Sequence, residues 1–217
     1  MQVQTQTQAQ VQICAFRGMI NEVVESIVLP QFRAYLQFIN HLNTRIMTDE
    51  YFLRRALQLA EESARAGFDP FGAVLVQDGK VVASTTDRSI LYSDPTAHAE
   101  LVLISEYCRT QQLISLEGHT LYSSAEPCIM CSGAIHWARI NRVVFCVSQT
   151  SLKKTSGGNP KPTCAELVNV GGKKVEVLGP LLEMEGLKIL NAFPWRSKKE
   201  RHEEYLNSNS FLKKKRL

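Results

Sequence analysis

The sequence predicts an α/β protein, a three-layer α/β/α sandwich with helices on both faces of a sheet. Strand-like and helix-like segments alternate regularly from residue 49 to residue 193, which is typical of this class. Asp78-Gly79 separates two apolar runs, as in a two-residue β-hairpin. A helical segment lies between the last two expected strands. We expect those strands to be parallel, because parallel neighbours need a long crossover.

The first half of the predicted domain begins with an amphipathic helix over residues 49–66. Thr48 is its expected N-cap, and acidic residues follow in the first turn. Strands over 71–77 and 81–86 flank the hairpin turn. Asp94-Pro95 combines a capping residue with a proline, which predicts that the next helix opens there.

The second half supplies the remaining elements. Pro127 opens a helix that we expect to run through Arg139. Lysine, serine, glycine and proline dominate the stretch from Ser148 to Pro162, which predicts a loop. The other expected elements are strands over 119–124, 142–147 and 174–178, a short helix near 163–169 and a helix over 181–193.

Changes in composition divide the chain into three parts. Residues 1–46 begin with a Gln-rich stretch and are interpreted as an N-terminal extension, either dispensable or the product of a mis-called start. A transit segment and a docking arm are the other interpretations. We expect a compact domain over 47–195 and a basic C-terminal tail over 196–217. In that tail Lys213 to Arg216 are interpreted as a solvated end rather than a nucleic-acid contact.

Composition describes an ordinary globular protein. Of 217 residues, 44% are hydrophobic and 21% charged, so a sizeable core is expected. The formal net charge of +4 does not by itself imply a nucleic-acid partner. Six cysteines are too sparse for a disulfide scaffold, which indicates a reducing, cytoplasmic compartment. No apolar run is long enough to span a bilayer, so no membrane partner is expected.

One His and two Cys form the candidate metal centre. His98 stands at one expected helix start, and Cys128 and Cys131 stand at another with i, i+3 spacing. Zinc favours nitrogen and thiolate ligands, and three protein ligands leave a fourth position open, as in catalytic sites. Glu100 follows His98 by two residues, so ideal helical phase separates the pair by about 200°. The two side chains must therefore straddle the metal from the first turn.

The residue types match a hydrolytic deamination. Zinc lowers the pKa of a bound water, and Glu100 would move protons from that water to the ring nitrogen and the leaving amine. H-x-E combined with P-C-x-x-C is the signature of zinc deaminases. Alternatively, Cys-x-x-Cys forms a redox pair or half of a closed structural zinc site. Further candidate ligands exist without paired ligand spacing, namely Cys146, Cys164, His119 and His136.

Three stretches of the chain resemble the cytidine deaminase superfamily, and most closely its guanine deaminase and tRNA adenosine deaminase branch. They are FGAVLVQDGKVVA (71–83), SDPTAHAELVLI (93–104) and SSAEPCIMCSGAIHWARINRVVF (123–145). The resemblance covers about residues 49–193. It implies a cytidine deaminase-like fold with a five-stranded mixed sheet, a homodimer and one Zn²⁺ per subunit. On this resemblance, 47–195 is the zinc deaminase domain.

Two positions depart from that branch. The branch usually carries Asn eleven residues before the ligand His, where it hydrogen-bonds the base, and this chain has Asp87 there. An ionised Asp only accepts hydrogen bonds, whereas Asn also donates. Guanine deaminases usually have a Phe-Asp-Asp segment after the fourth strand, where this chain has SLKKTSGGNPKP (151–162). We expect Asp87 and Phe71 to contact the substrate ring.

The expected function is therefore zinc-dependent hydrolytic deamination of a nucleobase or nucleoside, guanine- or cytosine-like, with release of ammonia. Such an aminohydrolase would serve purine or pyrimidine metabolism. The alternative substrate is adenosine in tRNA, which requires phosphate contacts around the pocket. A catalytically inactive, zinc-stabilised binding protein is the alternative from another class, and the presence of Glu100 argues against it.

Overall fold

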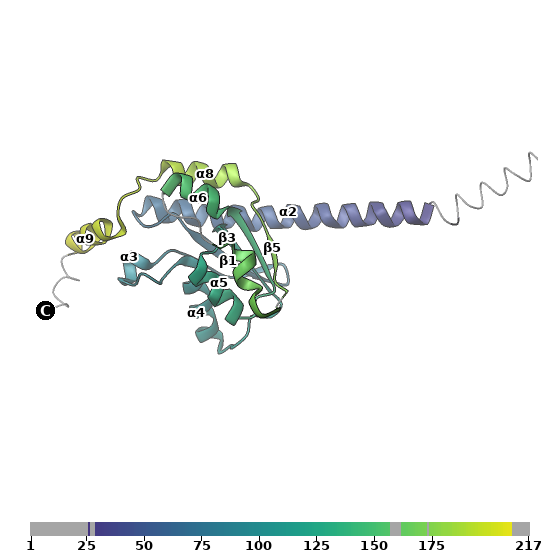
Figure 1. Ribbon diagram of the computed structural model, residues 1–217, viewed down its shortest axis with the longest axis horizontal. Helices are drawn as coiled ribbons and strands as arrows, with labels where there is room; N and C mark the ends of the chain where they lie inside the picture. Colours follow the sequence, from purple (N-terminus) through teal and green to yellow (C-terminus); the bar gives the residue numbers. More distant parts are fainter. Residues whose placement is uncertain (1–25, 27–28, 157–161, 173, 210–217) are drawn as a thin grey trace, which may run out of the picture. The chain divides into compact units, whose positions relative to one another are not determined.

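The computed structural model describes residues 26, 29–156, 162–172 and 174–209 (Figure 1). The chain divides into two compact units, Met1–Thr48 and Asp49–Leu217. The Gln-rich stretch over 1–12 and the basic residues Lys213 to Arg216 lie outside the described residues.

The first helix begins earlier than the sequence predicts. Helix α2 spans Leu29–Arg65, so the expected start at Thr48 is wrong. Thr48 and Asp49 are internal to the helix, because good helix formers such as Leu42 and Met47 precede them and outweigh a local capping signal. Pro30 lies in the first turn of α2, where a missing backbone N–H breaks no intrahelical bond.

The remaining elements follow the predicted alternation. In order they are β1 (Gly72–Gln77), β2 (Lys80–Thr86), α3 (Ser89–Tyr92), α4 (Ala99–Gln111), β3 (His119–Ala125), α5 (Ile129–Trp137), β4 (Arg142–Val147), α6 (Gln149–Ser156), α7 (Cys164–Val168), the 3-10 turn η2 (Val170–Gly172), β5 (Glu176–Leu178), α8 (Glu183–Ala192) and α9 (Lys198–Ser208).

The strands form one five-stranded mixed sheet in the order β2-β1-β3-β4-β5. β1 is antiparallel to β2 and β3, whereas β4 is parallel to β3 and to β5. The parallel pairing expected for the last two strands is confirmed. The hairpin is also confirmed, because Asp78 and Gly79 have φ values of 50° and 72°, as a type I′ turn requires.

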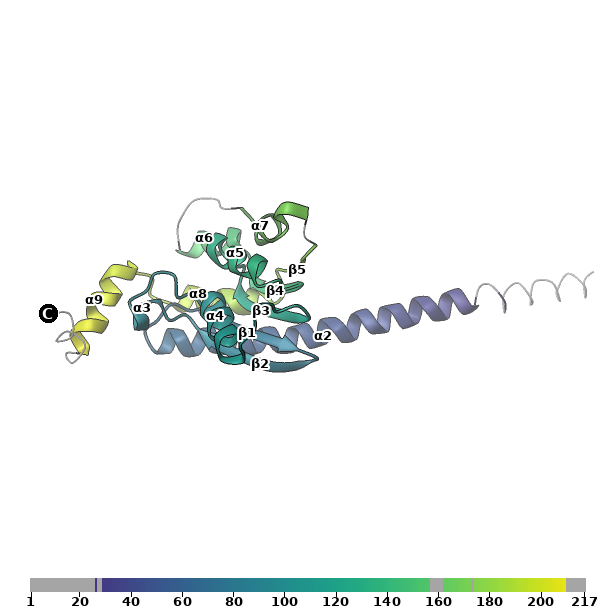
Figure 2. The same ribbon diagram turned by 90° about the horizontal axis from the view of Figure 1, so that it is seen from below.

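Two apolar layers bury the faces of the sheet, which confirms the three-layer sandwich. The part of α2 that begins at Asp49 and α8 cover one face, while α4, α5 and α7 cover the other (Figures 1 and 2). Consecutive β1 residues alternate between them, since Val74 belongs to the first layer and Leu75 to the second. A buried ion pair adds to the first layer, where Asp49 accepts two hydrogen bonds of 2.7 and 2.6 Å from Arg142.

Three local expectations differ from the structure. Asp94 does not open a helix; its Oδ1 accepts hydrogen bonds from the Thr96 backbone N–H and hydroxyl, which forms a turn, and α4 starts only at Ala99. The expected loop from Ser148 to Pro162 begins with helix α6 instead. Helix α9 forms after residue 195, where the sequence analysis expected a tail.

None of the helices in the described residues combines the length and the apolar character that a bilayer crossing requires.

We predict that Gly186→Ala destabilises the protein although alanine is the better helix former. An added Cβ would lie 2.4 Å from Val147 Cγ2 and 3.0 Å from Cys146 Sγ, between α8 and β4. Such overpacking costs about 1–3 kcal/mol, which exceeds the roughly 1 kcal/mol gained in helix propensity. Urea unfolding measures the change.

Gly133→Ala is the matched control. Gly133 is also helical, in α5, and no described atom lies within 4 Å of the added Cβ. Measured at a protein concentration low enough to keep the chain monomeric, this variant should unfold at a higher urea concentration than the wild type. Equal shifts for the two variants would contradict the close packing of α8 on β4.

Candidate active site

Two helix starts place the three predicted metal ligands. His98 is the N-cap of α4 and Cys128 is the N-cap of α5, both with extended backbone dihedrals. Neither side chain caps its own helix. Cys131 lies in the first turn of α5, on the same face as Cys128. All three side chains are thus directed to one point between the helix starts.

The ligand atoms have the separations that a tetrahedral zinc site needs. Cys128 Sγ lies 3.6 Å from His98 Nδ1 and 3.7 Å from Cys131 Sγ, and Cys131 Sγ lies 3.8 Å from His98 Nδ1. Zn–S bonds of about 2.3 Å and Zn–N bonds of about 2.05 Å at tetrahedral angles give about 3.8 Å between sulfurs and about 3.6 Å from sulfur to nitrogen. The donor set therefore fits zinc without rearrangement.

The two thiols of the candidate metal centre differ in pKa. The hydrogen bond between the two sulfurs lowers the pKa of Cys128 to about 3, and burial opposes this shift. The same hydrogen bond and burial raise the pKa of Cys131. One proton is thus shared between the two sulfurs at a helix start, whose partial positive charge favours a thiolate. A metal cation bound here would displace that proton and be held by both sulfurs.

Within the part of the chain that the structure describes, no fourth protein ligand completes a closed metal site. Among the described residues, His98, Cys128 and Cys131 are the only group of three or more potential ligands close enough to share an ion. Cys146 and Cys164 are buried, and burial raises the pKa of each to about 12, so they remain protonated thiols. The geometry therefore favours an open site over the closed structural alternative.

Glu100 is held beside the metal ligands. Its side chain is buried, and its Oε1 accepts a 2.8 Å hydrogen bond from the hydroxyl of Ser123 on β3. Burial raises its pKa above the ordinary value of a glutamic acid, which favours the protonated carboxyl relative to an exposed one. His98 is the N-cap of α4 and has extended backbone dihedrals. The angle of about 200° that an ideal helix would put between His98 and Glu100 therefore does not apply.

A pocket of about 220 Å³ opens onto this centre. Its walls include the predicted residues Phe71, His98, Glu100 and Cys128. Five further polar or aromatic residues line it that were not among the expected site residues, namely Glu126, Gln149, Ser156, Trp195 and Lys198. Cys131 is 1% exposed and is not among the residues that form the wall.

Glu126 fixes one wall of the pocket through backbone contacts. Its Oε2 accepts the N–H of Gln149 at the start of α6, and its Oε1 accepts the N–H of Cys164 at the start of α7, each at 2.8 Å. The Gln149 amide nitrogen donates back to the Glu126 carbonyl oxygen at 2.7 Å. One buried carboxylate thus anchors two helix N-termini next to the ligand Cys128.

Asp87 lies beside the pocket with one oxygen unsatisfied. Its backbone N–H donates to the Phe71 carbonyl, and its Oδ1 accepts hydrogen bonds from the Ser89 N–H and hydroxyl. The residue is 1% exposed, and Oδ2 has no hydrogen-bond partner in the described part of the chain. Burial raises the pKa of Asp87, while the positive charge of Lys198 opposes the shift. Asp87 is not among the residues that line the pocket.

Helix α9 reaches the pocket because Asp69 holds it. Asp69 is 3% exposed, and its Oδ1 accepts a hydrogen bond from buried Arg201. Its Oδ2 pairs with Lys198 Nζ at 2.7 Å. The guanidinium of Arg201 also stacks over the Phe193 ring, 5.3 Å from its centroid. These contacts attach α9 to the turn before β1 and place Lys198 in the pocket wall.

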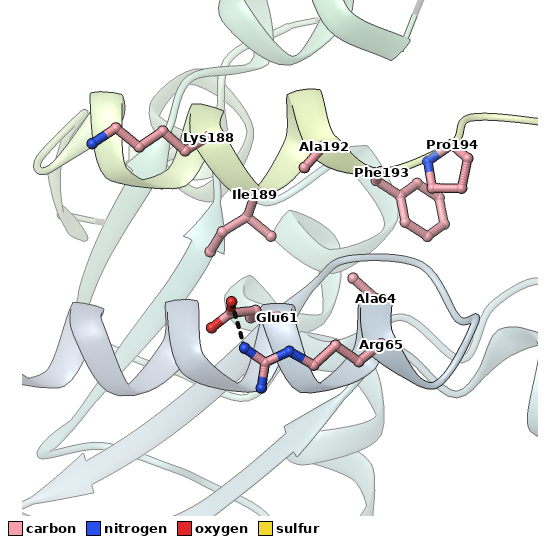
Figure 3. Close-up of a pocket in the computed structure, with 8 residues that line it drawn as sticks. All are labelled: Glu61, Ala64, Arg65, Lys188, Ile189, Ala192, Phe193 and Pro194. Atoms are coloured by element: carbon pink, nitrogen blue, oxygen red, sulfur yellow. Dashed lines mark hydrogen bonds and ion pairs between the residues drawn. The ribbon is translucent and has the colours of Figure 1, made fainter.

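A second pocket, of about 350 Å³, lies between α2 and α8 (Figure 3). It contains none of the predicted site residues. Its charged groups include Glu61 and Arg65, which pair with each other at 2.7 Å, while Ile189 and Phe193 give it an apolar floor. This groove lacks the metal ligands and the buried carboxylates that mark the first pocket.

Comparisons with known proteins agree with this geometry. The family model for the cytidine and deoxycytidylate deaminase zinc-binding region matches residues 46–147. The chain is 44% identical over 105 residues to the guanine deaminase of Bacillus subtilis, covering 48% of this chain and 67% of that protein. It is 34% identical over 165 residues to the tRNA-specific adenosine deaminase of Buchnera aphidicola subsp. Baizongia pistaciae, covering 75% of this chain and 97% of that protein.

The fold of this chain is also similar to that of a solved deaminase structure. It comes from work on A-to-I editing by tRNA:A34 deaminases at the wobble position of transfer RNA. Its similarity to this chain has a TM-score of 0.56 with 32% identity, and the match covers 64% of this chain and 99% of that one.

We predict that Asp69→Asn strongly destabilises the protein. The substitution leaves buried Arg201 and half-buried Lys198 without their carboxylate, and breaking a buried ion pair typically costs about 3–5 kcal/mol. Chemical denaturation measures the free energy of unfolding. The matched control is Glu204→Gln in α9, which breaks the exposed pair with Arg196 just before the helix and should change little. If both variants unfold alike, Asp69 does not hold α9.

Proposed function

The chain belongs to the cytidine and deoxycytidylate deaminase zinc-binding family, and from that premise we propose that it is an aminohydrolase with one zinc ion per chain, held by His98, Cys128 and Cys131. The observation that carries the proposal is the spacing of the three donor atoms, 3.6 to 3.8 Å, in a pocket that also contains the Glu100 carboxyl. The reaction replaces an amino group on a heterocycle with a carbonyl oxygen from water and releases ammonia.

The division of labour follows from the residues. Zinc supplies the Lewis acidity that activates water at neutral pH. Glu100 accepts a proton from the attacking water and delivers it to the ring nitrogen. It then takes the proton of the hydroxyl group added to the ring carbon and passes it to the amine, which leaves as ammonia. Ser123 holds Glu100 Oε1 and thereby orients the other carboxyl oxygen. Phe71 and Trp195, whose ring centroids are 6.4 Å apart, give the ring an apolar environment.

A free base is the substrate class that we favour, guanine- or cytosine-like. The pocket, at about 220 Å³, falls below the common range of roughly 300–1,000 Å³ for ligand sites. So small a volume suits a single heterocycle. Gln149, Lys198 and Asp87 offer polar groups at or beside its walls.

Adenosine in tRNA is the second candidate. Lysines on two helices near the pocket favour it: Lys153 and Lys154 in the last turn of α6, and Lys198 and Lys199 in the first turn of α9. Phosphate contacts of this kind would place a polynucleotide over the opening. An inactive zinc-stabilised binding protein is disfavoured by the buried, oriented Glu100.

We also propose that the chain forms a homodimer through an interface on α5. Ile129 and Trp137 on this helix are 58% and 81% exposed, which is unusual for large apolar side chains. Burial of this face against a second copy would remove them from water. The division into an extension over 1–46, a deaminase domain over 47–195 and a basic tail over 196–217 stays a prediction, as does the cytoplasmic location.

We expect the purified protein to contain about one zinc per chain. Glu100→Ala should keep the metal and lose at least about 100-fold in turnover, because proton transfer by a positioned side chain contributes roughly that much or more. Cys128→Ala should lose the metal itself. Metal content by mass spectrometry and ammonia release measure the two effects separately. Retained turnover in the Glu100 variant would contradict the proposed mechanism.

Ammonia release from a panel of bases, nucleosides and tRNA identifies the substrate. We expect guanine or cytosine to be deaminated with little dependence on salt. A tRNA deaminase would instead bind its substrate more weakly as salt rises, because phosphate contacts release counterions. Full zinc occupancy without ammonia from any member of the panel would favour the inactive alternative.

A further inference from the structure

Gln149 brings a buried side-chain amide to the wall of the pocket beside the metal ligands. The residue is 7% exposed, and its backbone N–H donates to Glu126 Oε2 at 2.8 Å. Its Nε2 donates to the Glu126 carbonyl oxygen at 2.7 Å. A reversed amide would put two acceptors against each other, so this contact settles which end of the amide carries the oxygen. Oε1 is therefore the end of the amide that Glu126 does not hold.

The oxygen of this amide is an acceptor that no donor satisfies. Among the residues that the structure describes, both hydrogen bonds of Gln149 go to Glu126 through N–H groups, and none reaches Oε1. Oε1 is not one of the fully enclosed side-chain atoms that lack a partner in the described part of the chain, so it keeps some accessible surface. The pocket of about 220 Å³ is the cavity that Gln149 lines. A molecule bound there can therefore donate to this oxygen.

The two carboxylates of the pocket wall are already engaged. Glu126 Oε1 accepts the N–H of Cys164, and its Oε2 accepts the N–H of Gln149. Glu100 Oε1 accepts the hydroxyl of Ser123, and the proposed reaction uses this carboxyl to move protons. Gln149 thus gives the pocket a neutral acceptor that is held in one orientation and has no other task.

We propose that Gln149 is a specificity-determining residue, whose Oε1 accepts a hydrogen bond from a ring N–H of the substrate. Glu126 is then a positioning residue, because it holds the amide from two sides. An acceptor that is held before the substrate arrives loses little freedom on binding. The inference rests on the proposed function and deepens it, since it names the group on the ring that is recognised besides the amine that leaves.

This contact selects a class of substrate. A site built to hydrogen-bond an N–H rejects the analogue that lacks it, because the polar group of the site then stays unpaired. A heterocycle that carries a ring N–H satisfies Gln149 Oε1, whereas the same ring with a substituent on that nitrogen does not. The enzyme should therefore prefer a base to the analogue methylated at the recognised nitrogen.

N-methylated bases test the contact in the full-length, zinc-loaded protein. Cytosine and guanine are compared with analogues in which a methyl group replaces one ring N–H at a time, and ammonia release gives kcat/KM. We expect the wild type to prefer the base to one of these analogues. Gln149→Met should reduce that preference about 10- to 100-fold, the usual effect of a buried acceptor left unpaired. A purely structural role would lower kcat/KM for base and analogue alike.

Two further variants separate the oxygen from the rest of the side chain. Thr150→Val is the matched control, since Thr150 is the next residue of α6, is exposed and does not line the pocket, and it should leave the preference unchanged. Gln149→Glu keeps an acceptor oxygen whether the carboxyl is protonated or ionised. It should therefore retain the preference for the base within about 3-fold.

Three outcomes would overturn the proposal. Gln149→Met could lower kcat/KM equally for the bases and every analogue, or its preference could equal that of Thr150→Val. Alternatively, Gln149→Glu could lose the preference as fully as Gln149→Met, which would exclude Oε1 as the recognising atom. Ammonia release by the wild type is measured first. Without it the proposed function fails and this inference with it, whereas an active wild type with any of the three outcomes contradicts the Gln149 contact alone.

Discussion

The meeting of two helix starts is the constraint on which the site depends. His98 and Cys128 are N-caps of α4 and α5, so their backbones are extended and their side chains are free to turn toward each other. A shift of either helix by one residue would rotate its donor by about 100° and break the tetrahedral spacing. The sheet sets the positions of both starts, since β3 provides Ser123 for Glu100 and leads directly into Glu126 and the α5 motif.

Much of this arrangement could be predicted because it is local in sequence. The hairpin turn, the strand patterns and the paired motif each depend on neighbouring residues, and the structure agrees with them. Helix α6 could not be predicted, because the polar groups at its start form hydrogen bonds with residues that are distant in sequence. Ser148 bonds to the Glu183 carboxylate, and Gln149 bonds to Glu126. A stretch rich in lysine, serine and glycine that lacks such distant acceptors is expected to form a loop.

The pocket wall formed by Trp195 and Lys198 could not be predicted for a related reason. These residues follow Cys131 by more than sixty positions, and a buried carboxylate before β1 determines where they lie. A local signal for α9 was nevertheless present in the sequence. Ser197 and Glu200 form a capping box, which marks a helix start in what was expected to be a tail. The signal predicts a helix but not its contact with the pocket.

The potential metal ligands and Lys198 lie far apart along the sequence, which affects how substitutions can change the pocket. The three potential metal ligands lie between residues 98 and 131, while α9 follows the last strand and is joined to the domain by Asp69 and by contacts with Phe68 and Ser93. Substitutions at Trp195 and Lys198 therefore change the wall of the pocket without replacing any of the three potential metal ligands. A library confined to this short segment is a direct route to new substrates, and natural divergence in substrate choice can follow the same route.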